Sequence, residues 1–544
     1  MPAADLPARV TAWIAADPDP VTRAELQALL DAGSPDSTAD LAQRFAAPLV
    51  FGTAGLRGPL RAGPNGMNRA VVRRAAAGLG AFLDAAGRPG AVVIGYDARF
   101  GSADFARDTA GVLQATGRPA VVLPGPLPTP VLAFAVRHLQ AVAGVMVTAS
   151  HNPPGDNGYK VYLGDGGQIV PPADRDIEAA IAAVGPASSI ALDEGYQVLG
   201  DEVVDAYVSG VVRLLSPAAD RDLTIAYTPL HGVGAAVARA VFARAGFPPL
   251  HVVAEQERPD PRFPTVAFPN PEEPGATDLL RALATTTGAD LAIANDPDAD
   301  RCAVISGGRM LTGDELGVLL ADHLMTRGVR PGAAFATTIV SSSLLGAMCA
   351  RHGVPYAETL TGFKWIARAG DLKPETRFLF GYEEALGYTV GTTVRDKDGI
   401  GAALAVLSLA TRARAGGDSL LEAYDALEAA HGVHLTGQIT VPTTEPVHVM
   451  SRLRIAAPAE LAGQVVTSTS DLTGGTGDLP SADVLRYWLA GARVVIRPSG
   501  TEPRIKAYLE VVEPVIAGRL TEARRAARAR MDPLREAVRE LLNG

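Results

Sequence analysis

A serine in a short polar segment is the first candidate for covalent chemistry. Ser150 and His151 lie in the segment Thr148-Ala-Ser-His-Asn-Pro-Pro154, and Lys160 follows ten positions after Ser150. A serine nucleophile needs a neighbour that accepts its proton, and His151 and Lys160 both qualify by type. A polar turn rich in Asn, Pro and Gly explains the segment equally well without chemistry. The pattern differs from Gly-x-Ser-x-Gly, so it does not predict a hydrolase elbow.

Three aspartates at alternate positions form the second candidate. Asp296, Asp298 and Asp300 are separated by Pro297 and an alanine, and Arg301 follows. Residues at this spacing lie on one side of an extended segment, and a proline argues against a helix there. Three neighbouring carboxylates repel one another unless a cation lies between them, and hard oxygen ligands favour Mg²⁺ or Ca²⁺. The alternative is a solvated acidic turn.

Three further segments carry groups that bind polar ligands. Paired glutamates at Glu383 and Glu384 are able to accept hydrogen bonds from sugar hydroxyls, although a helix start explains them more simply. The segment 497–501 combines arginine, serine, glycine and threonine in a tight turn, which favours anion binding over a plain hairpin loop. Arg57 lies between Gly55 and Gly58 and is weak evidence by itself.

The elements that must position these residues follow a repeated order. Residues 91–147, 223–294 and 334–380 each read strand, helix, strand, helix, strand, which predicts largely parallel sheets covered by helices. Ligands of such sheets bind beyond the carboxyl ends of the strands, and each candidate motif follows the third strand of a unit. After Gly432 the pattern changes to short strands and a final helix. A capping-box pattern at residues 22–25 predicts a short helix in the N-terminal extension.

Composition restricts the remaining possibilities. The 544 residues suggest three or four domains, and 47% hydrophobic with 20% charged residues is ordinary for a globular protein. The net charge of −10 argues against nucleic-acid binding. Two cysteines build no disulfide framework, which fits a reducing cytoplasm. The sequence shows no signal peptide and no apolar run long enough to span a membrane.

Taken together, the motifs resemble the α-D-phosphohexomutase superfamily of phosphoglucomutases and phosphomannomutases. Its phosphoserine, metal, sugar and phosphate loops match residues 148–160, 296–301, 383–385 and 497–501, in that order. The resemblance implies an α/β fold of four domains around a central cleft. Three are related α/β units with mixed, mostly parallel sheets, and the C-terminal one is a smaller α+β domain. We place an N-terminal helical extension at 1–45 and the domains at 46–210, 211–315, 316–435 and 436–544.

The resemblance also implies a role for each candidate residue. Ser150 would carry a phosphate, and one Mg²⁺ per chain would be held by Asp296, Asp298, Asp300 and a phosphoserine oxygen. Lys160 would be the general acid/base with His151 in support, and Arg57 and Arg301 would flank the reacting phosphate. The substrate would be bound by Thr361, Gly362, Lys364, Glu383, Lys397, Arg497, Ser499, Gly500 and Thr501.

The expected function is therefore a mutase that interconverts hexose 1-phosphate and hexose 6-phosphate, with glucose or mannose as the sugar. The resemblance implies a bisphosphorylated intermediate, a sugar bisphosphate activator and a small-molecule phosphosugar as the partner. Many relatives have serine at the position of Ala385. With alanine there, the sequence is more similar to the phosphopentomutase-like branch, so a ribose substrate is the alternative. A metal-dependent phosphatase and a non-catalytic sugar-phosphate sensor are the alternatives from other classes. We expect a cytoplasmic monomer or weak homodimer.

Overall fold

The structure is a computed structural model that describes residues 5–52, 55–215, 221–371, 375–477, 479–499 and 504–543. The chain forms two compact units. The first contains residues 1–310 and 389–407, and the second contains residues 311–388 and 408–544. The chain therefore leaves the first unit, returns to it for a short segment, and leaves it again.

The N-terminal extension consists of three helices. They are α1 (Leu6–Ala16), α2 (Pro20–Ala32) and α3 (Pro35–Arg44). Val10, Leu26 and Leu41 are buried between them. The predicted capping box was wrong, because α2 begins at Pro20 with Asp19 as its N-cap. The Thr22 hydroxyl lies within the helix and donates to Asp17 instead, at 2.8 Å.

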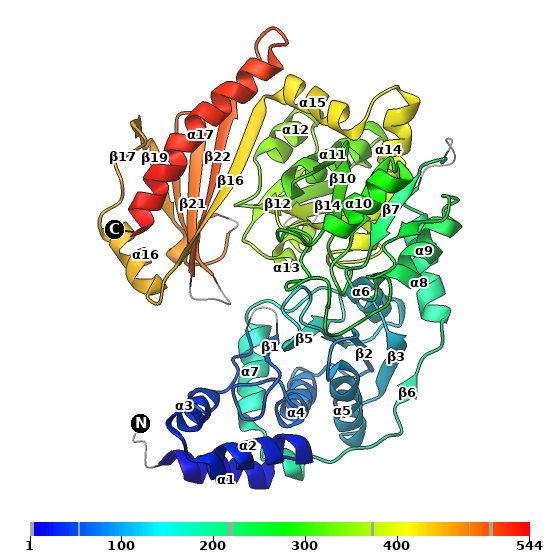
Figure 1. Ribbon diagram of the computed structural model, residues 1–544, viewed down its shortest axis with the longest axis vertical. Coiled ribbons are helices and arrows are strands. Elements are labelled where there is room, and N and C mark those ends of the chain that lie inside the picture. The colour runs from blue at the N-terminus through cyan, green and yellow to red at the C-terminus, as the bar shows by residue number, and fades with distance from the viewer. Residues whose placement is uncertain are drawn as a thin grey trace. The chain divides into compact units, whose positions relative to one another are not determined.

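A six-stranded sheet organises the first α/β domain, in the order β1-β5-β4-β2-β3-β6. The strands are β1 (Leu56–Pro59), β2 (Val92–Tyr96), β3 (Ala120–Pro126), β4 (Ala143–Val147), β5 (Asp156–Leu163) and β6 (Gln197–Val198). β2 pairs with β3 and β4 in parallel, whereas β5 runs antiparallel to β4 and β1. The helices are α4 (Arg69–Ala85), α5 (Ser102–Ala115), α6 (Thr129–His138) and α7 (Ala173–Ala183), with α6 on the opposite face from α4 and α5 (Figure 1). Because β5 returns antiparallel to β4, Lys160 pairs with Met146 near the carboxyl end of β4.

The second α/β domain has a sheet in the order β11-β10-β9-β7-β8, with β7 parallel to β8 and β9. Its strands are β7 (Ile225–Thr228), β8 (His251–Val252), β9 (Leu291–Ala294), β10 (Ala303–Ser306) and β11 (Arg309–Met310). Its helices are α8 (Glu202–Val212), α9 (Gly234–Arg244) and α10 (Asp278–Thr287). All four residues of β9 are buried, and the three aspartates leave the sheet directly after this strand.

The second unit begins with the third α/β domain, whose sheet has the order β13-β12-β14-β15. Its strands are β12 (Ala333–Thr338), β13 (Tyr356–Thr359), β14 (Arg377–Glu383) and β15 (Gly387–Val390). Its helices are α11 (Gly313–Thr326), α12 (Leu344–His352), α13 (Phe363–Ile366) and α15 (Leu420–His431), whereas α14 (Gly399–Ala415) begins in the first unit and ends in the second. β12 is parallel to β13 and β14, so the carboxyl ends of these strands meet at one edge. Glu383 ends β14, so the helix start considered for it is wrong.

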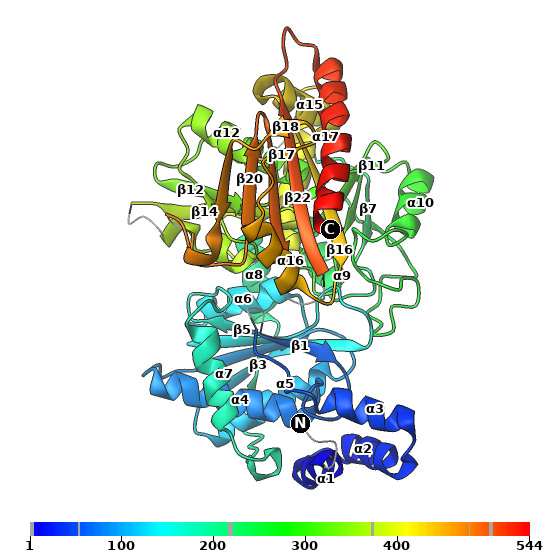
Figure 2. The ribbon, with the colours of Figure 1, turned by 90° about the vertical axis from the view of Figure 1, so that its left-hand side faces the viewer.

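The C-terminal domain is built on a five-stranded sheet in the order β16-β22-β21-β20-β19, whose paired neighbours are antiparallel. The strands are β16 (Val433–Pro442), β19 (Ser468–Asp471), β20 (Leu485–Leu489), β21 (Ala492–Pro498) and β22 (Arg504–Glu513), beside the short pair β17 (Glu460–Leu461) and β18 (Gln464–Val465). The helices are α16 (Pro446–Ile455) and α17 (Leu520–Asn543). α17 packs along β16 and β22 and buries Ala527, Leu534 and Val538 (Figure 2).

The predicted fold class is confirmed, because the three strand–helix units and the final α+β domain occur in the expected order. The third strands of the first two units, β4 and β9, end at Val147 and Ala294, as expected. Among the described residues, none of the helices combines the length and apolar character that a bilayer crossing needs.

Candidate active site

Ser150 lies in a strained and tightly held loop at the carboxyl end of β4. Its φ angle of 53° falls in the left-handed region, which non-glycine residues rarely adopt. The conformation is fixed on both sides, because the Ser150 amide donates to the Thr148 hydroxyl at 2.8 Å and its carbonyl accepts from Arg99 at 2.6 Å. The Ser150 hydroxyl thus points to Asp296, with Oγ 2.8 Å from Oδ2, and lies 3.2 Å from His151 Nδ1.

The three aspartates converge on one buried point after β9. Asp296, Asp298 and Asp300 are fully buried, and one carboxylate oxygen of each lies within 4.8 Å of the other two. Thr129 donates to Asp298 Oδ2 at 2.6 Å. The Oδ1 atoms of Asp298 and Asp300 have no hydrogen-bond partner in the described part of the chain. Buried carboxylate oxygens without donors are the ligands that a hard divalent cation prefers, so this donor set is able to hold a metal ion.

Two lysines contact the aspartates from different segments. Lys160 Nζ on β5 lies 2.8 Å from Asp298 Oδ2 and 3.1 Å from Asp300 Oδ2, and Lys397 Nζ lies 3.1 Å from Asp300 Oδ2. Burial alone would lower the pKa of Lys160, but the carboxylates of Asp298 and Asp300 raise it above its ordinary value. Burial raises the pKa of Asp296, and the charges of Asp298 and Asp300 raise it further.

His151 and two arginines complete the site in the first unit. Burial lowers the pKa of His151 well below its ordinary value, and the charges of Arg301 and Arg57 lower it further, so the imidazole is neutral at physiological pH. Arg57 donates to the Asn152 side chain at 3.1 Å, and the Arg301 amide donates to Asp296 at 2.9 Å. The site therefore combines a serine, a neutral base, three carboxylates and cationic side chains.

The second unit carries the residues predicted to bind substrate, except Lys397, which belongs to the first unit. Glu383 is half-buried at the end of β14, and Thr361 and Gly362 precede α13, where the buried Lys364 ammonium lies 5.6 Å from the centre of the Trp365 ring. Gly362 has a φ of 109°, which favours glycine at this turn.

Arg497 ends β21 in the same unit. Its guanidinium lies over the Tyr508 ring and donates to the Tyr508 hydroxyl at 3.2 Å. Burial and the nearby Glu384 carboxylate raise the pKa of Tyr508 to about 12. The Ser499 amide donates to the Arg504 carbonyl at 2.9 Å and closes the hairpin. Gly500 and Thr501 lie outside the described residues.

Two positioning residues escaped the sequence analysis. Arg99 binds the carbonyls of Ser150, Pro153 and Asp156 and so holds the whole serine loop. Thr129 contacts Asp298 from the start of α6 through its hydroxyl and its amide. Both residues follow strands β2 and β3 at their carboxyl ends, so the strand-end rule applied to every strand would have found them.

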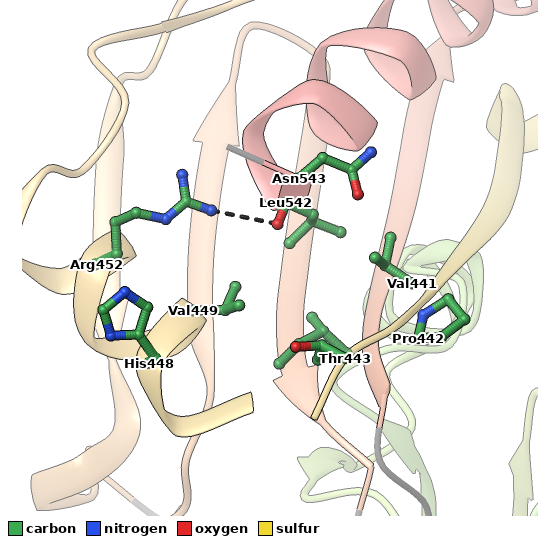
Figure 3. A pocket seen from close by; sticks show the side chains of 9 residues that line it. Val441, Pro442, Thr443, His448, Val449, Arg452, Leu542 and Asn543 are labelled. Carbon is green, nitrogen blue, oxygen red and sulfur yellow. Dashed lines mark hydrogen bonds between the residues drawn. The ribbon is translucent and has the colours of Figure 1, made fainter. Parts of the chain in front are cut away.

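A separate pocket lies in the C-terminal domain, far in sequence from the serine and the aspartates. It has a volume of about 310 Å³ and is lined by residues of β16, α16 and the end of α17 (Figure 3). Arg452 donates to the carbonyls of Leu541 and Leu542 and thereby caps α17 beside it. The described residues that line this pocket include none of the predicted site residues, and Arg452 is already used in helix capping.

Comparison with protein families assigns the chain. Four family descriptions match it in order: domains I, II and III of phosphoglucomutase/phosphomannomutase, each alpha/beta/alpha, at residues 48–187, 205–308 and 312–429, and the C-terminal domain at 444–527. The chain belongs to the phosphoglucomutase/phosphomannomutase family. The resemblance inferred from the motifs is confirmed, and a member of this phosphomutase family is an intramolecular phosphotransferase that acts on a sugar phosphate.

Individual relatives of the family carry different substrate names. A Haemophilus influenzae protein described as a probable phosphomannomutase is 44% identical over 82% of this chain and 93% of its own length. A Schizosaccharomyces pombe protein described as a probable phosphoribomutase is 35% identical over 92% of each chain. A crystal structure from Thermus thermophilus, of a protein described as a phosphomannomutase, is 28% identical, covers 92% of this chain and all of its own, and has a TM-score of 0.72.

Proposed function

We propose that this protein interconverts hexose 1-phosphate and hexose 6-phosphate, with glucose or mannose as the sugar, through a phosphorylated Ser150. The observation that carries the proposal is the contact between Ser150 Oγ and Asp296 Oδ2, at 2.8 Å, inside a buried cluster of three carboxylates. A nucleophilic oxygen that lies beside a site for a divalent cation is the arrangement that phosphoryl transfer requires.

In the proposed reaction the Ser150 phosphate is transferred to a free hydroxyl of the sugar phosphate. The bond between phosphorus and Ser150 Oγ breaks, the sugar oxygen bonds to phosphorus and loses its proton, and Ser150 Oγ regains one. Lys160 is the general acid/base and the neutral His151, 3.2 Å from Ser150 Oγ, supports it. The bisphosphorylated sugar then turns over and returns its other phosphate to Ser150.

The surrounding charges serve the transfer. One Mg²⁺ per chain, held by Asp296, Asp298, Asp300 and a phosphoserine oxygen, would supply charge neutralisation for the transferring group. Arg57 and Arg301 would flank that group, since Arg57 donates to the Asn152 side chain of the serine loop and the Arg301 amide donates to Asp296. Glu383 binds sugar hydroxyls and Arg497 binds the distal phosphate, with the remaining contacts from Thr361, Gly362, Lys364, Lys397, Ser499, Gly500 and Thr501.

A pentose substrate is the second candidate, interconverted between ribose 1-phosphate and ribose 5-phosphate. The observation that favours it is Ala385, which offers no hydroxyl two positions after Glu383. The similarity to the yeast protein described as a probable phosphoribomutase also supports this substrate, because it covers 92% of both chains.

Other features belong to the same proposal. The enzyme requires a sugar bisphosphate as activator, which restores the phosphate on Ser150 when an intermediate escapes. We place it in the cytoplasm as a monomer or weak homodimer without nucleic-acid or membrane partners. Domain boundaries near residues 45, 210, 315 and 435 remain part of the proposal.

The decisive experiment monitors the phosphate on Ser150. Intact-mass analysis of the wild type, incubated with glucose 1,6-bisphosphate, should show a population heavier by one phosphate that maps to the loop of residues 148–154. Ser150→Ala should lose the added mass and nearly all turnover, since no covalent intermediate is able to form. Stoichiometric release of inorganic phosphate without isomerised sugar would instead identify a phosphatase. Binding without turnover would identify a sensor.

A further inference from the structure

The turn of residues 341–343, which we call the serine turn, joins β12 to α12 and contacts the sugar loop. The hydroxyls of Ser341 and of the preceding Thr338 both donate to Glu384 Oε2, each at 3.2 Å. Glu384 directly follows Glu383 at the end of β14. Ser341 and Thr338 are fully buried, so these bonds are protected from water. The serine turn therefore fixes the residue next to the proposed sugar ligand.

The opposite side of the serine turn is held by the C-terminal domain. Glu510 on β22 accepts through Oε1 from the Ser343 amide at 2.7 Å and from the hydroxyls of Ser342 and Ser343 at 3.0 and 3.1 Å. Its Oε2 accepts from Arg493 Nε at 2.6 Å, and another nitrogen of Arg493 donates to the Ser341 carbonyl. Arg493 and Glu510 are cross-strand partners on β21 and β22, which gives the pair a rigid base.

Neighbouring charged groups keep this pair ionised. Burial alone would raise the pKa of Glu510, but Arg493 and His434 lower it to about 2. Asp314 approaches the serine turn from α11 and accepts from the Ser342 amide at 2.7 Å. Glu358 on β13 lies 3.3 Å from the far side of the Arg493 guanidinium. The bonds of Glu510 and Arg493 to the serine turn are thus charge-assisted, and such bonds are shorter and stronger than neutral ones.

We propose that the Arg493–Glu510 ion pair is a positioning element for the sugar loop, acting through the serine turn on Glu384 and so on Glu383. The inference deepens the proposed function and rests on it, because it takes Glu383 to be the sugar ligand. A buried ion pair adds little net stability compared with an apolar pair, and here its directional bonds restrict where the serine turn lies. The C-terminal domain therefore contributes to sugar recognition without contacting the sugar through this pair.

Another ion pair between the same two domains serves as an internal comparison. Arg524 on α17 donates from Nε to Glu428 Oε2 on α15 at 2.7 Å. Glu428 is as buried as Glu510, with 4% and 3% of their surfaces exposed. Within the described part of the chain, the carboxylate of Glu428 pairs with Arg524 and bonds neither to the serine turn nor to Glu384. Glu428→Gln is therefore a matched control that weakens domain packing without changing the sugar loop.

The first test is a double-mutant cycle between Glu384→Gln and Glu510→Gln, two residues that share the serine turn as their common partner. Each single variant should raise KM for the sugar 1-phosphate about tenfold, because its partner hydroxyls and amides lose a charged acceptor. The KM of the double variant should be no higher than that of the poorer single variant. It should then be at least about threefold lower than the product of the two single effects predicts. Glu428→Gln should change KM by less than about twofold, and its effect on KM should simply multiply that of Glu384→Gln in the double variant. Multiplied effects in the first cycle would overturn the proposal, and so would a KM change in Glu428→Gln equal to that in Glu510→Gln.

The second test does not depend on activity. Hydrogen exchange of the amides at residues 381–388 in the free enzyme should be at least about threefold faster in Glu510→Gln than in the wild type, and unchanged in Glu428→Gln. If Glu510→Gln does not fold, Arg493→Lys replaces it in this test, because lysine keeps the charge but lacks the several donors of the guanidinium. If exchange is faster in Glu510→Gln but the wild type has no mutase activity, the proposed function fails and the positioning role stands. Unchanged exchange in Glu510→Gln, with normal turnover in the wild type, would overturn the positioning role alone.

Discussion

Arg99 fixes the position of Ser150. Its side chain donates to backbone carbonyls of the serine loop and not to the three aspartates. Arg99→Ala should lower kcat about 10- to 100-fold with KM within about threefold, because a strained loop without its carbonyl partners misplaces the nucleophile. The fraction of phosphorylated Ser150 should fall in parallel. Arg99→Lys should recover part of the loss, and Arg107→Ala, which removes an exposed arginine on α5, should change nothing. Wild-type kcat in Arg99→Ala would contradict this role.

Asp314 gives the protein a pH-dependent stability. Burial raises the pKa of this carboxyl to about 7, and the charges of Glu384 and Glu510 contribute. The native state therefore holds a proton that the unfolded chain releases near pH 4. The stabilisation that comes from this proton is present at low pH and is lost as pH rises to about 7. From pH 5 to pH 8, the free energy of unfolding of Asp314→Asn should rise by about 3 kcal/mol relative to that of the wild type. The wild type loses this amount over the roughly two pH units between pH 5 and the raised pKa. Urea unfolding of both proteins at the two pH values measures this, and a constant difference would disprove it.

At the scale of elements, the approach of β1 to β5 depends on one glycine. Gly55 has a φ of 80°, and a Cβ there would lie 1.9 Å from the Tyr159 carbonyl oxygen. Gly55→Ala should therefore push β1 away from β5 and displace Arg57 and Lys160, which the two strands carry. We expect a loss of activity of about 10- to 100-fold in a folded protein. Gly125→Ala on β3, where an added Cβ would meet no other residue's atoms within 4 Å beyond its chain neighbours, should be fully active, and circular dichroism checks the fold of both variants.

The sequence was most informative about elements and about the residues directly after each strand. The repeated strand–helix order was recognisable, and the strand-end rule led from it to Ser150 and the three aspartates. Arg99 and Thr129 were missed because their role depends on contacts between distant segments, such as the 2.6 Å bond from Thr129 to Asp298. The start of α2 was misplaced because Asp19 and Pro20 supplied a stronger cap than Thr22.

At the scale of the whole molecule, a mutase must hold its substrate in two opposite orientations. One anion site then has to grip the distal phosphate each time, and the guanidinium of Arg497 suits that task. Arg497→Ala should lower kcat/KM about 10- to 100-fold in the forward and reverse directions alike, and Arg497→Lys should recover only part. Arg454→Ala, which removes an arginine of the same domain paired with Asp471 and Asp483, should leave kcat/KM unchanged. A large loss in one direction only would mean that another site holds the phosphate in that orientation.

The return of residues 389–407 to the first unit has a consequence for how the protein is made. This segment brings Lys397 to Asp300, and its neighbours Asp396 and Asp398 accept hydrogen bonds from Tyr162 and Tyr207, each at 2.8 Å. A nascent chain that ends at residue 310 therefore contains the serine and all three aspartates but leaves both buried tyrosine hydroxyls without these acceptors. The first unit becomes complete only after the ribosome has translated residue 407 of 544. The first unit is thus finished late in synthesis, after the whole third sheet has been translated.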